Sequence, residues 1–556
     1  MRLASRVLVA LALGSVSSAA LAQIIPPSEQ PGRERLRFEQ QPPALARQAG
    51  PTITLPSATA PAGAASTFVS IRSVHVVGST VYTEAQLAPL YQDLIGQSVS
   101  LQAVYDLARK ITAKYGGDGY VLSRAIVPPQ SLDPKRADIT IQVVEGYVDT
   151  VEWPKTLSRY RDFFTSYAAK ITSERPANIR TIERYLLLAG DLPGLKFSTS
   201  LRASPNQPGA STLVVAVTEK LVDAMGRIDS QGSKARGPYE FLGSLTANNW
   251  LGDHDAFTLT YAGAFPLTEL QYLEGNYRQV LNTEGLTAFV DVNHSWGRPG
   301  TAPLEALKYL TYGTQAYGGL SYPVIRSRER NLTFSALGFF SDDNAYTLGA
   351  LFNRDRLRGV RIKVDGDFAD GFGGTDQLNV TFSQGIDGLG STANGDPLAS
   401  RAAGRVDFTK LEGTFIHTQP LVGNFSLQLS AYGQYAFTPL LSPEQCGYGG
   451  ALFGRAFDPS IVTGDSCVEA SGELRYDLPI TGVWVTRAQL YGFADWGDLF
   501  TRDAAAGTPA HTEAASAGGG LRLGLKQNLN ADVFLARSVE GPQEDRRVFL
   551  TLTARY

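Results

Sequence analysis

The sequence has no strong excess of charge of either sign. Its 556 residues include 50 Lys and Arg against 53 Asp and Glu, so the formal net charge is −3. Charged residues make up 19% of the chain, below the quarter that is usual in globular domains. A basic surface of the kind that binds nucleic acid is not expected, and we predict no nucleic-acid partner.

Long hydrophobic runs are missing beyond the N-terminus. The chain opens with MRLASRVLVALALGSVSSAALAQ, in which Arg2 and Arg6 precede a short apolar core. Ala20-Leu21-Ala22 fits the small-x-small cleavage rule, so we predict a signal peptide over residues 1–22 and a mature chain that starts at Gln23. An anchoring helix is the alternative, but the apolar core is too short to span a bilayer. No later stretch is long and apolar enough for a membrane helix, which excludes a helical bundle.

Motifs for catalysis and for metal binding are also missing. No histidine lies in H-E-x-x-H or another metal spacing, and we find no G-x-S-x-G elbow, P-loop or dinucleotide fingerprint. Some barrel enzymes use a Ser-His pair on the lipid-facing wall, and His294 is the one candidate for such a pair. We therefore expect no catalytic residues, no cofactor, no metal site and no enzymatic activity. The histidines considered are His75, His254, His294, His417 and His511.

Residues 23–67 are rich in Pro, Ala and Gln. This composition does not bury a core and indicates a linker. Within it, residues 32–41 are compatible with a short polar helix or with disorder.

Two α/β units follow, over residues 68–147 and 148–220. In each, an alternating strand precedes two stretches with apolar residues at helical spacing, and two further strands close the unit. The order β-α-α-β-β occurs twice, which predicts an internal repeat.

From residue 221 to residue 556, alternating segments of about ten residues are separated by turn signals, which indicates a transmembrane β-barrel. In Val468 to Leu478 the residues Val468, Leu474 and Leu478 share one face, and charged residues share the other. A soluble sandwich is the alternative for one such strand, but a long series favours a barrel. The last residues alternate down to the terminal Tyr556, as outer-membrane barrels do. We predict sixteen strands, near 221–231, 239–250, 255–265, 268–281, 285–296, 308–322, 329–343, 354–369, 375–387, 402–417, 423–438, 466–478, 483–496, 512–526, 529–538 and 546–556, with an outer loop that carries strand extensions at 342–356.

The chain resembles the TpsB transporters of two-partner secretion, the haemolysin secretion/activation family ShlB/FhaC/HecB, over nearly all of its mature length. GYVLSRAIVPPQ and VVEGYV resemble the first POTRA domain of this family, and NNWLGDHDAFTL resembles its early barrel strand and turn. Gly454-Arg455-Ala456-Phe457 resembles the VRG-aromatic motif of the sixth extracellular loop, with Ala456 where the family has glycine. Phe493-Ala494-Asp495-Trp496-Gly497 matches the strand motif F-x-D-x-G.

The resemblance implies a clamp between the loop and the barrel wall. Arg455 would pair with Asp495, with Phe457, Phe493 and Gly497 as the other motif residues of the clamp. The phase of the strand agrees, since Asp495 has the parity expected to face the lumen. Separately, Cys446 and Cys467 bracket the loop, and an exported protein passes through an oxidising compartment. One disulfide between them is expected, with two free thiols as the alternative.

The resemblance also implies the function. We expect a monomeric pore in the outer membrane of a Gram-negative bacterium, with periplasmic N-terminal domains and outer-membrane lipid around the barrel. It would secrete a large partner exoprotein that bears an N-terminal secretion domain, and a segment of the linker over residues 23–67 would plug the resting pore. The expected partner-binding edge is the strand from Leu195 to Ser204, in particular Leu195, Phe197, Thr199 and Leu201, with residues 178–189 as groove wall. An outer-membrane protein insertase and a passive porin are the rival functions.

Overall fold

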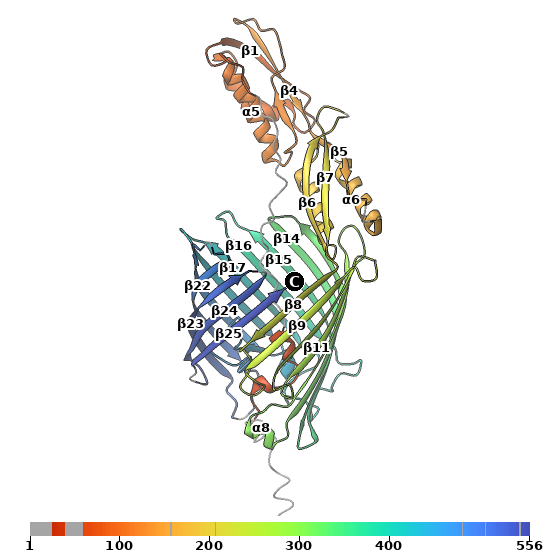
Figure 1. Cartoon of the computed structure of the whole chain (residues 1–556), viewed down its shortest axis with the longest axis vertical. Coiled ribbons are helices and arrows are strands. Elements are labelled where there is room, and N and C mark those ends of the chain that lie inside the picture. Colours follow the sequence, from red (N-terminus) through yellow and green to blue (C-terminus); the bar gives the residue numbers. More distant parts are fainter. Residues whose placement is uncertain are drawn as a thin grey trace, which may run out of the picture.

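The computed structural model describes residues 25–38, 59–155, 158–205, 207–480, 482–505, 507–526, 528–543 and 546–556. The predicted signal peptide lies outside these ranges. Two small α/β units stand at one end of a closed β-barrel (Figure 1). Within the described ranges, no helix has the length and apolar character needed to cross a membrane.

The first α/β unit is built around one long helix. Its elements are β1 (Phe68–Val77), α4 (Glu84–Leu87), β2 (Ser98–Ser100), α5 (Leu101–Gly117), β3 (Arg124–Ile126) and β4 (Ala137–Val144). The sheet order is β2-β1-β4-β3, with β1 and β4 parallel. The apolar face of α5, including Leu107 and Ile111, packs on this sheet. The predicted β-α-α-β-β order is present, with the short strand β2 added between the helices.

The second α/β unit has the same order of elements. It contains β5 (Tyr147–Glu152), α6 (Arg161–Ser173), α7 (Ile179–Gly190), β6 (Leu195–Ala203) and β7 (Ala210–Glu219). Its sheet order is β5-β7-β6, so β6 is an edge strand. Asn178 begins α7 as an N-cap, because its side chain accepts a hydrogen bond from the Arg180 amide.

The barrel closes through sixteen antiparallel strands, as predicted, and the last strand pairs with the first. Its strands are β8 (Val222–Asp229), β9 (Tyr239–Asn248), β10 (Asp255–Phe265), β11 (Gln271–Val280), β12 (Thr287–Gly297), β13 (Leu310–Arg326), β14 (Arg330–Thr347), β15 (Ala350–Ala369), β16 (Thr375–Gly385), β17 (Thr409–Pro420), β18 (Phe425–Ala436), β21 (Ser466–Leu478), β22 (Val485–Phe500), β23 (His511–Leu525), β24 (Leu529–Glu540) and β25 (Arg546–Arg555). Closure satisfies the backbone groups of every strand, as a lipid environment requires.

The two faces of the wall differ in polarity, as the alternation predicts. On β21, Val468 and Leu474 are about half exposed on the outer face, whereas Glu469 and Glu473 are buried on the face that lines the lumen. On β15, Val360 and Ile362 point outward, and Leu357 is fully buried inside. This pattern places an apolar belt against lipid and a polar surface inside.

The predicted outer loop at 342–356 is shorter than expected, and its strand extensions are longer. β14 continues to Thr347 and β15 begins at Ala350. The two strands join through a tight turn at Leu348 and Gly349, both with positive φ. The outward residues here are polar and ionic, such as Asp342 and Arg356. The hairpin loses its apolar face where it rises out of the membrane, and the sequence therefore looks like a loop.

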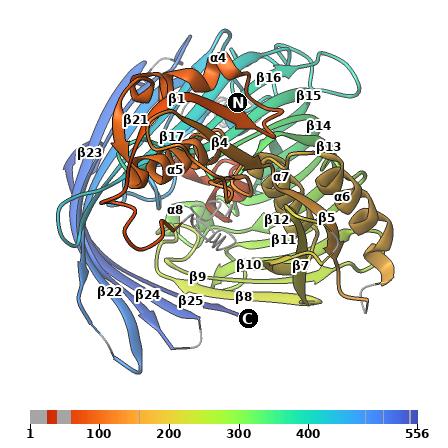
Figure 2. The ribbon, with the colours of Figure 1, turned by 90° about the horizontal axis from the view of Figure 1, so that it is seen from above.

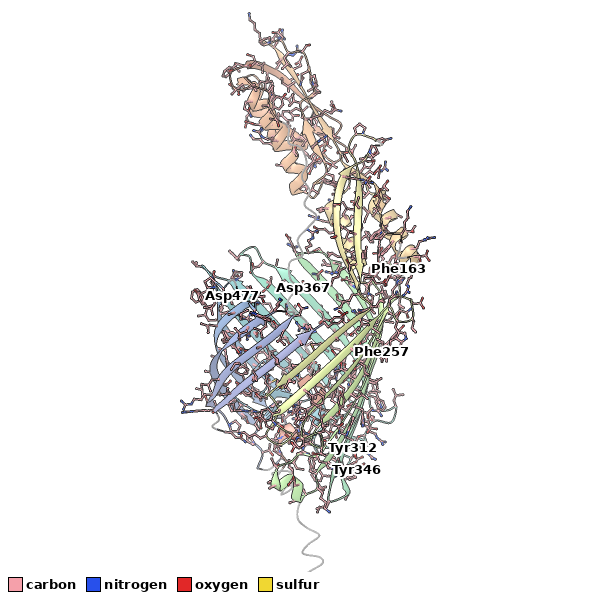
Figure 3. All side chains as sticks on the ribbon, in the orientation of Figure 1. Phe163, Phe257, Tyr312, Tyr346, Asp367 and Asp477 are labelled. Carbon is pink, nitrogen blue, oxygen red and sulfur yellow. A yellow bond between two sulfur atoms is a disulfide. The ribbon has the colours of Figure 1, made fainter. Side chains whose placement is uncertain are left out.

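The second α/β unit docks on the turns at the near end of the barrel. Glu284, in the turn between β11 and β12, receives hydrogen bonds from the Tyr185 hydroxyl (3.0 Å) and from Arg184 (3.4 Å). Arg326 binds the Asp191 carboxylate through two hydrogen bonds of 2.7 Å. Phe163, labelled at this junction in Figure 3, packs its ring on His254 with centroids 4.0 Å apart. Ionic and aromatic contacts thus fix this unit beside the barrel mouth.

Residues 25–38 lie inside the barrel, as the view along its axis shows (Figure 2). They form the short helices η1 (Pro27–Glu29) and α3 (Glu34–Phe38). The sequence left a short helix and disorder open over 32–41, and within the described part of this range the structure has the helix α3. We call residues 25–38 the luminal segment.

Candidate functional site

The candidate site is the loop between β18 and β21, residues 437–465, which folds into the lumen. It contains η5 (Ser442–Glu444) and a small hairpin of β19 (Cys446–Tyr448) and β20 (Val462–Gly464). Glu444 anchors its first part between Arg361 of β15 (2.6 Å) and Lys410 of β17 (2.9 Å). Asp458, beyond the tip, binds Arg547 of β25 at 2.5 Å. The loop therefore crosses the lumen from one wall to another.

At the tip of the loop, Arg455 meets Asp495 of β22, as predicted. The guanidinium donates to both carboxylate oxygens, from Nη2 at 2.8 Å and from Nε at 3.1 Å, and the Arg455 amide adds a third bond of 3.0 Å. The side chain of Arg455 is 8% exposed and that of Asp495 is fully buried. A bidentate, charge-assisted pair of this kind fixes both the position and the orientation of the loop.

A second carboxylate completes the socket for Arg455. Glu473 of β21 accepts from Arg455 Nη1 at 2.6 Å, and it also binds Arg475 and Arg522. Ser471 donates to Asp495 and accepts from Arg455 Nη2, with distances of 2.8 and 2.9 Å. Arg455 thus joins an ionic network in which Glu473 is already paired with two arginines of the barrel wall.

The remaining predicted clamp residues also come together. The Arg455 guanidinium lies 3.5 Å from the centre of the Phe493 ring, a cation–π contact. Phe457 is buried, with its ring 5.9 Å from that of Tyr448. Both aromatic residues belong to one apolar cluster that surrounds the ionic network.

Two glycines of the motifs leave room for one ring. A Cβ added at Gly454 would lie 2.6 Å from Cε1 of Tyr448, and one added at Gly497 would lie 2.7 Å from Cε2. The Tyr448 ring therefore fits between the loop and β22 only because both positions are glycine. Gly454 has a φ of +71°, whereas the buried Ala456 is not among the residues of positive φ. Alanine in place of the family's glycine therefore carries no backbone strain here.

Cys446 and Cys467 form the expected disulfide. It joins β19 of the loop to β21 of the wall, and both residues are buried. The bridge closes a segment of 21 residues that includes Arg455. In the chain-entropy view, closing a loop of this size stabilises by about 3 kcal/mol.

The luminal segment contacts both the wall and the loop. Glu29 and Arg236 form an ion pair of 2.7 Å in which neither side chain is more than 1% exposed. Arg37 pairs with Glu240 of β9, also at 2.7 Å. Arg33 donates to the carbonyl oxygens of Ser442 and Gln445, at 3.0 and 2.9 Å, just before Cys446. The segment and the loop therefore fill the lumen as one connected body.

Sequence reasoning missed several of these residues. Glu473 and Ser471 share the inward face of β21 with other charged residues, and that shared parity is the signal that could have found them. Tyr448 and Arg33 carry no comparable signal, because their partners lie on segments whose path through the lumen is not periodic.

The predicted partner-binding edge is a free edge in this structure. Among the described strands β6 pairs with β7 alone. Lys220 donates to the Gly194 carbonyl and Ser204 donates to that of Ala210, so the even residues of β6 carry the bonds to β7. The backbone groups of Phe197, Thr199 and Leu201 therefore face away from the sheet.

The described residues include one group with the spacing of a metal site. Asp370, Asp376 and His417 lie near one another at the end of the barrel close to the α/β units, with His417 Nδ1 2.7 Å from Asp376 Oδ1. They are partly exposed, and no further contact among the described residues points to an ion there. His294 hydrogen-bonds Thr314 at 2.8 Å and stacks on Trp296. A serine partner for His294 does not occur among these contacts.

Comparisons with known proteins agree with this architecture. Residues 69–146 match the model of the POTRA domain, ShlB-type, and residues 209–523 match the haemolysin secretion/activation protein ShlB/FhaC/HecB. The heme/hemopexin transporter protein HuxB of Haemophilus influenzae (strain 86-028NP) is 21% identical over 425 residues, which cover 74% of this chain and 73% of that protein. The outer membrane transporter CdiB of Dickeya dadantii (strain 3937) is 22% identical over 440 residues, 74% of each chain. The structure of CdiB from Escherichia coli is similar in fold, with a TM-score of 0.67 and 19% identity over 92% of this chain and 94% of that one.

Proposed function

Because the chain belongs to the haemolysin secretion/activation family ShlB/FhaC/HecB, whose members are outer-membrane transporters, we propose that it secretes one large exoprotein from the periplasm to the cell surface. The observation that supports this proposal is the lumen. A single chain closes a sixteen-strand pore, and the segments inside it are held by ionic contacts, by apolar packing and, for the loop, by one disulfide. None of these contacts belongs to the backbone pairing of the wall, so the luminal segment can leave, and the loop can move as far as its disulfide allows, without unfolding the wall.

We propose that cargo first meets the second α/β unit. The free backbone groups at Phe197, Thr199 and Leu201 offer an edge to which an extended segment can add as a further strand. This unit is fixed beside the barrel mouth by Glu284 and Arg326, so a segment bound to β6 is delivered close to the lumen. Phe197 and Leu201 are partly buried and supply apolar contact for alternate side chains of the added strand.

In this proposal Arg455 holds the loop in its working position. Replacing Arg455 would leave Asp495 buried without its cation, and breaking a buried pair in this way costs about 3–5 kcal/mol. The barrel strands do not depend on the loop for their pairing. The pore should therefore insert, but the loop should lose its defined position.

The test is a secretion assay with a candidate exoprotein. Cells that express the exoprotein are compared with no transporter, with the wild type and with Arg455→Ala. We expect exoprotein in the culture medium with the wild type and about tenfold less, or lower still, with Arg455→Ala. The matched control is Arg487→Ala, which removes an exposed arginine paired with Asp477 and should secrete normally.

Three outcomes decide between the alternatives. If the exoprotein stays inside in cells with the wild type, and depletion of this chain blocks insertion of other barrels, the insertase function replaces the transporter. If the exoprotein leaves the cell without this chain, the transporter proposal fails. If Arg455→Ala secretes as much as Arg487→Ala, the clamp has no role in transport.

No chemical step enters this proposal. The ionic networks of the lumen hold protein segments, and the function needs no catalytic centre or cofactor.

A further inference from the structure

Three arginines form a stripe on the outer face of β15. Alternation along this strand places Arg354, Arg356 and Arg358 on the same outward face as Val360 and Ile362, which are 46% and 53% exposed. The inward residues between them, such as Leu357, are buried in the lumen. Residues two apart on one face lie about 7 Å from each other. The stripe therefore presents cations over roughly 13 Å of the outer wall.

The stripe lies at the far end of the barrel from the α/β units. The hairpin of β14 and β15 turns at Leu348, and Tyr312 and Tyr346 mark this end of the wall in Figure 3. Their rings are 6.1 Å apart, in an edge-to-face arrangement. Going outward along the hairpin, the outer face changes from Phe340 and Val360 to Asp342 and Arg356. The arginines thus begin where the apolar belt ends on the extracellular side.

Arg358 lies deepest and lacks an anionic partner. It is 8% exposed, and its guanidinium lies 3.4 Å from the centre of the Phe340 ring. Its Nη1 donates to the carbonyls of Ser341 and Leu357, while its buried Nε has no hydrogen-bond partner. No carboxylate of the described residues forms an ion pair with it. An uncompensated cation at the edge of the hydrocarbon layer is unfavourable unless an anion meets it.

The other two arginines are partly exposed and form only long ion pairs. Arg356 Nε is 3.4 Å from Asp342 and Arg354 Nη2 is 4.0 Å from Asp396, both longer than charge-assisted hydrogen bonds. The side chains of Arg354 and Arg356 are 33% and 41% exposed, although the Nε atom of each is buried and lacks a hydrogen-bond partner. Two carboxylates therefore face three guanidinium groups, which leaves one excess positive charge beside two partly exposed arginines.

We propose that this stripe binds a phosphorylated lipid of the outer leaflet. Arginine is well suited to phosphate because its N–H groups match two phosphate oxygens at once. Directly below Arg358, Val360 and Ile362 continue the same face toward the membrane centre. An amphiphile with phosphates at the arginines would therefore lay its acyl chains along these two residues. A soluble phosphate would use the arginines but not the apolar part of the surface.

Native mass spectrometry of the full chain in detergent tests this proposal, with diphosphorylated lipid A as the probe. We expect wild type to bind it, and the triple variant Arg354→Gln, Arg356→Gln, Arg358→Gln to bind at least tenfold more weakly. Arg356→Gln alone should weaken binding severalfold. The matched control is Arg405→Gln, which removes one exposed extracellular arginine paired with Asp407 and should bind as the wild type does.

Folding and the source of the phosphate are controlled separately. Resistance of the barrel to unfolding in cold SDS shows whether each variant is folded. If the triple variant is not folded, the single variant Arg356→Gln takes its place in the binding test. Lipid A without phosphates should bind wild type as weakly as the triple variant binds lipid A. Equal binding by wild type and Arg356→Gln would overturn the proposal. The proposal would also be overturned if millimolar inorganic phosphate displaced bound lipid A as effectively as added lipid A does. The surface would then bind free anions.

Discussion

At the scale of the residue, the site depends on fit as much as on charge. Arg455 reaches Asp495 because the loop and β22 approach closely, and the Tyr448 ring fills the space between them. Gly454 and Gly497 are the two positions that permit this approach. The motif glycines therefore make room for the Tyr448 ring, and Gly454 also adopts a positive φ.

Gly497→Ala should destabilise the loop-filled barrel. The added Cβ would overlap the Tyr448 ring, and overpacking of this kind costs about 1–3 kcal/mol. Urea unfolding of the purified barrel in detergent measures the loss. The second substitution Tyr448→Ala should remove most of the penalty of Gly497→Ala, which a double-mutant cycle would show.

The matched control for this prediction is Gly492→Ala on the same strand. There the nearest atom to an added Cβ is 3.9 Å away, so its effect should be small. Equal losses at positions 492 and 497 would mean that the Tyr448 ring is not the cause.

The sequence predicted a contact between two side chains where a pattern identified each of them, as for Arg455 and Asp495. Asp495 lies on a regular strand whose parity faces the lumen, and Arg455 lies in a motif that the family resemblance identifies. The same parity argument could have predicted that Glu473 faces the lumen. The partners of Glu29 and Arg33 could not be predicted, because no periodic pattern in residues 25–38 indicates which wall these residues face.

At the scale of the element, the edge strand β6 carries a test of the docking proposal. Thr199→Pro removes an amide donor from the free edge and leaves the bonds to β7 in place, since proline is tolerated on an edge with its nitrogen outward. Binding of the exoprotein's N-terminal secretion domain, measured by calorimetry, should weaken about tenfold or more. Thr199→Ala keeps the donor and should bind normally; equal loss in both variants would point to the side chain instead of the backbone edge.

The contact between α7 and the barrel turns predicts a dependence on pH. Burial tends to raise the pKa of Glu284, but hydrogen bonds from Tyr185, Lys170 and Arg184 outweigh it and lower that pKa below 4.5. A lowered pKa stabilises the docked state above pH 4.5, and this stability is lost as the pH falls through the lowered value. Glu284→Gln should therefore loosen docking at neutral pH, and acid should loosen it in the wild type.

Glu183 on α7 has a pKa that is shifted in the opposite direction from that of Glu284. Burial raises its pKa despite the nearby Arg328, so its ionised form is disfavoured in the docked state. Glu183→Gln should leave docking unchanged or tighten it. Electron paramagnetic resonance between spin labels at Lys155 and Phe372 would report both variants as distance distributions. A broader distribution for Glu183→Gln than for Glu284→Gln would contradict this assignment.

Most elements followed from periodicity, but the lengths of some strands did not, above all in the hairpin of β14 and β15. The hairpin of β14 and β15 rises beyond the membrane, where its outward face changes from Phe340 and Val360 to Asp342 and Arg356. Alternation between apolar and polar residues ends at that height, although the backbone ladder continues. A strand outside lipid therefore resembles a loop in sequence.

At the scale of the whole molecule, the lumen is filled by two segments far apart in the chain. The luminal segment is held by Glu29 and Arg236, and the loop is held by Arg455 and Asp495. Neither segment is part of the wall, and Arg33 connects one to the other. Opening of the pore therefore requires movement of both.

Arg236→Ala should open the resting pore. The substitution leaves Glu29 buried without its cation, so the luminal segment should leave its position, with a cost of about 3–5 kcal/mol for the broken pair. Planar-bilayer recordings should show a higher mean conductance than wild type. Arg405→Ala, an exposed arginine in an extracellular loop, should conduct as the wild type does. Equal conductance in Arg236→Ala and wild type would show that this pair does not hold the segment.

The way in which Arg33 holds the loop has an evolutionary consequence. It donates to main-chain oxygens of Ser442 and Gln445, and every amino acid supplies such an oxygen. Substitutions that keep the main-chain path at these two positions leave the contact intact, whereas Arg33 has no equivalent replacement. Elsewhere in this part of the loop, Gly447 does not tolerate a side chain, because an added Cβ would lie 2.8 Å from Nη1 of Arg33. Drift in this lineage should therefore be one-sided, with variable side chains at positions 442 and 445 facing an arginine and a glycine that stay constant.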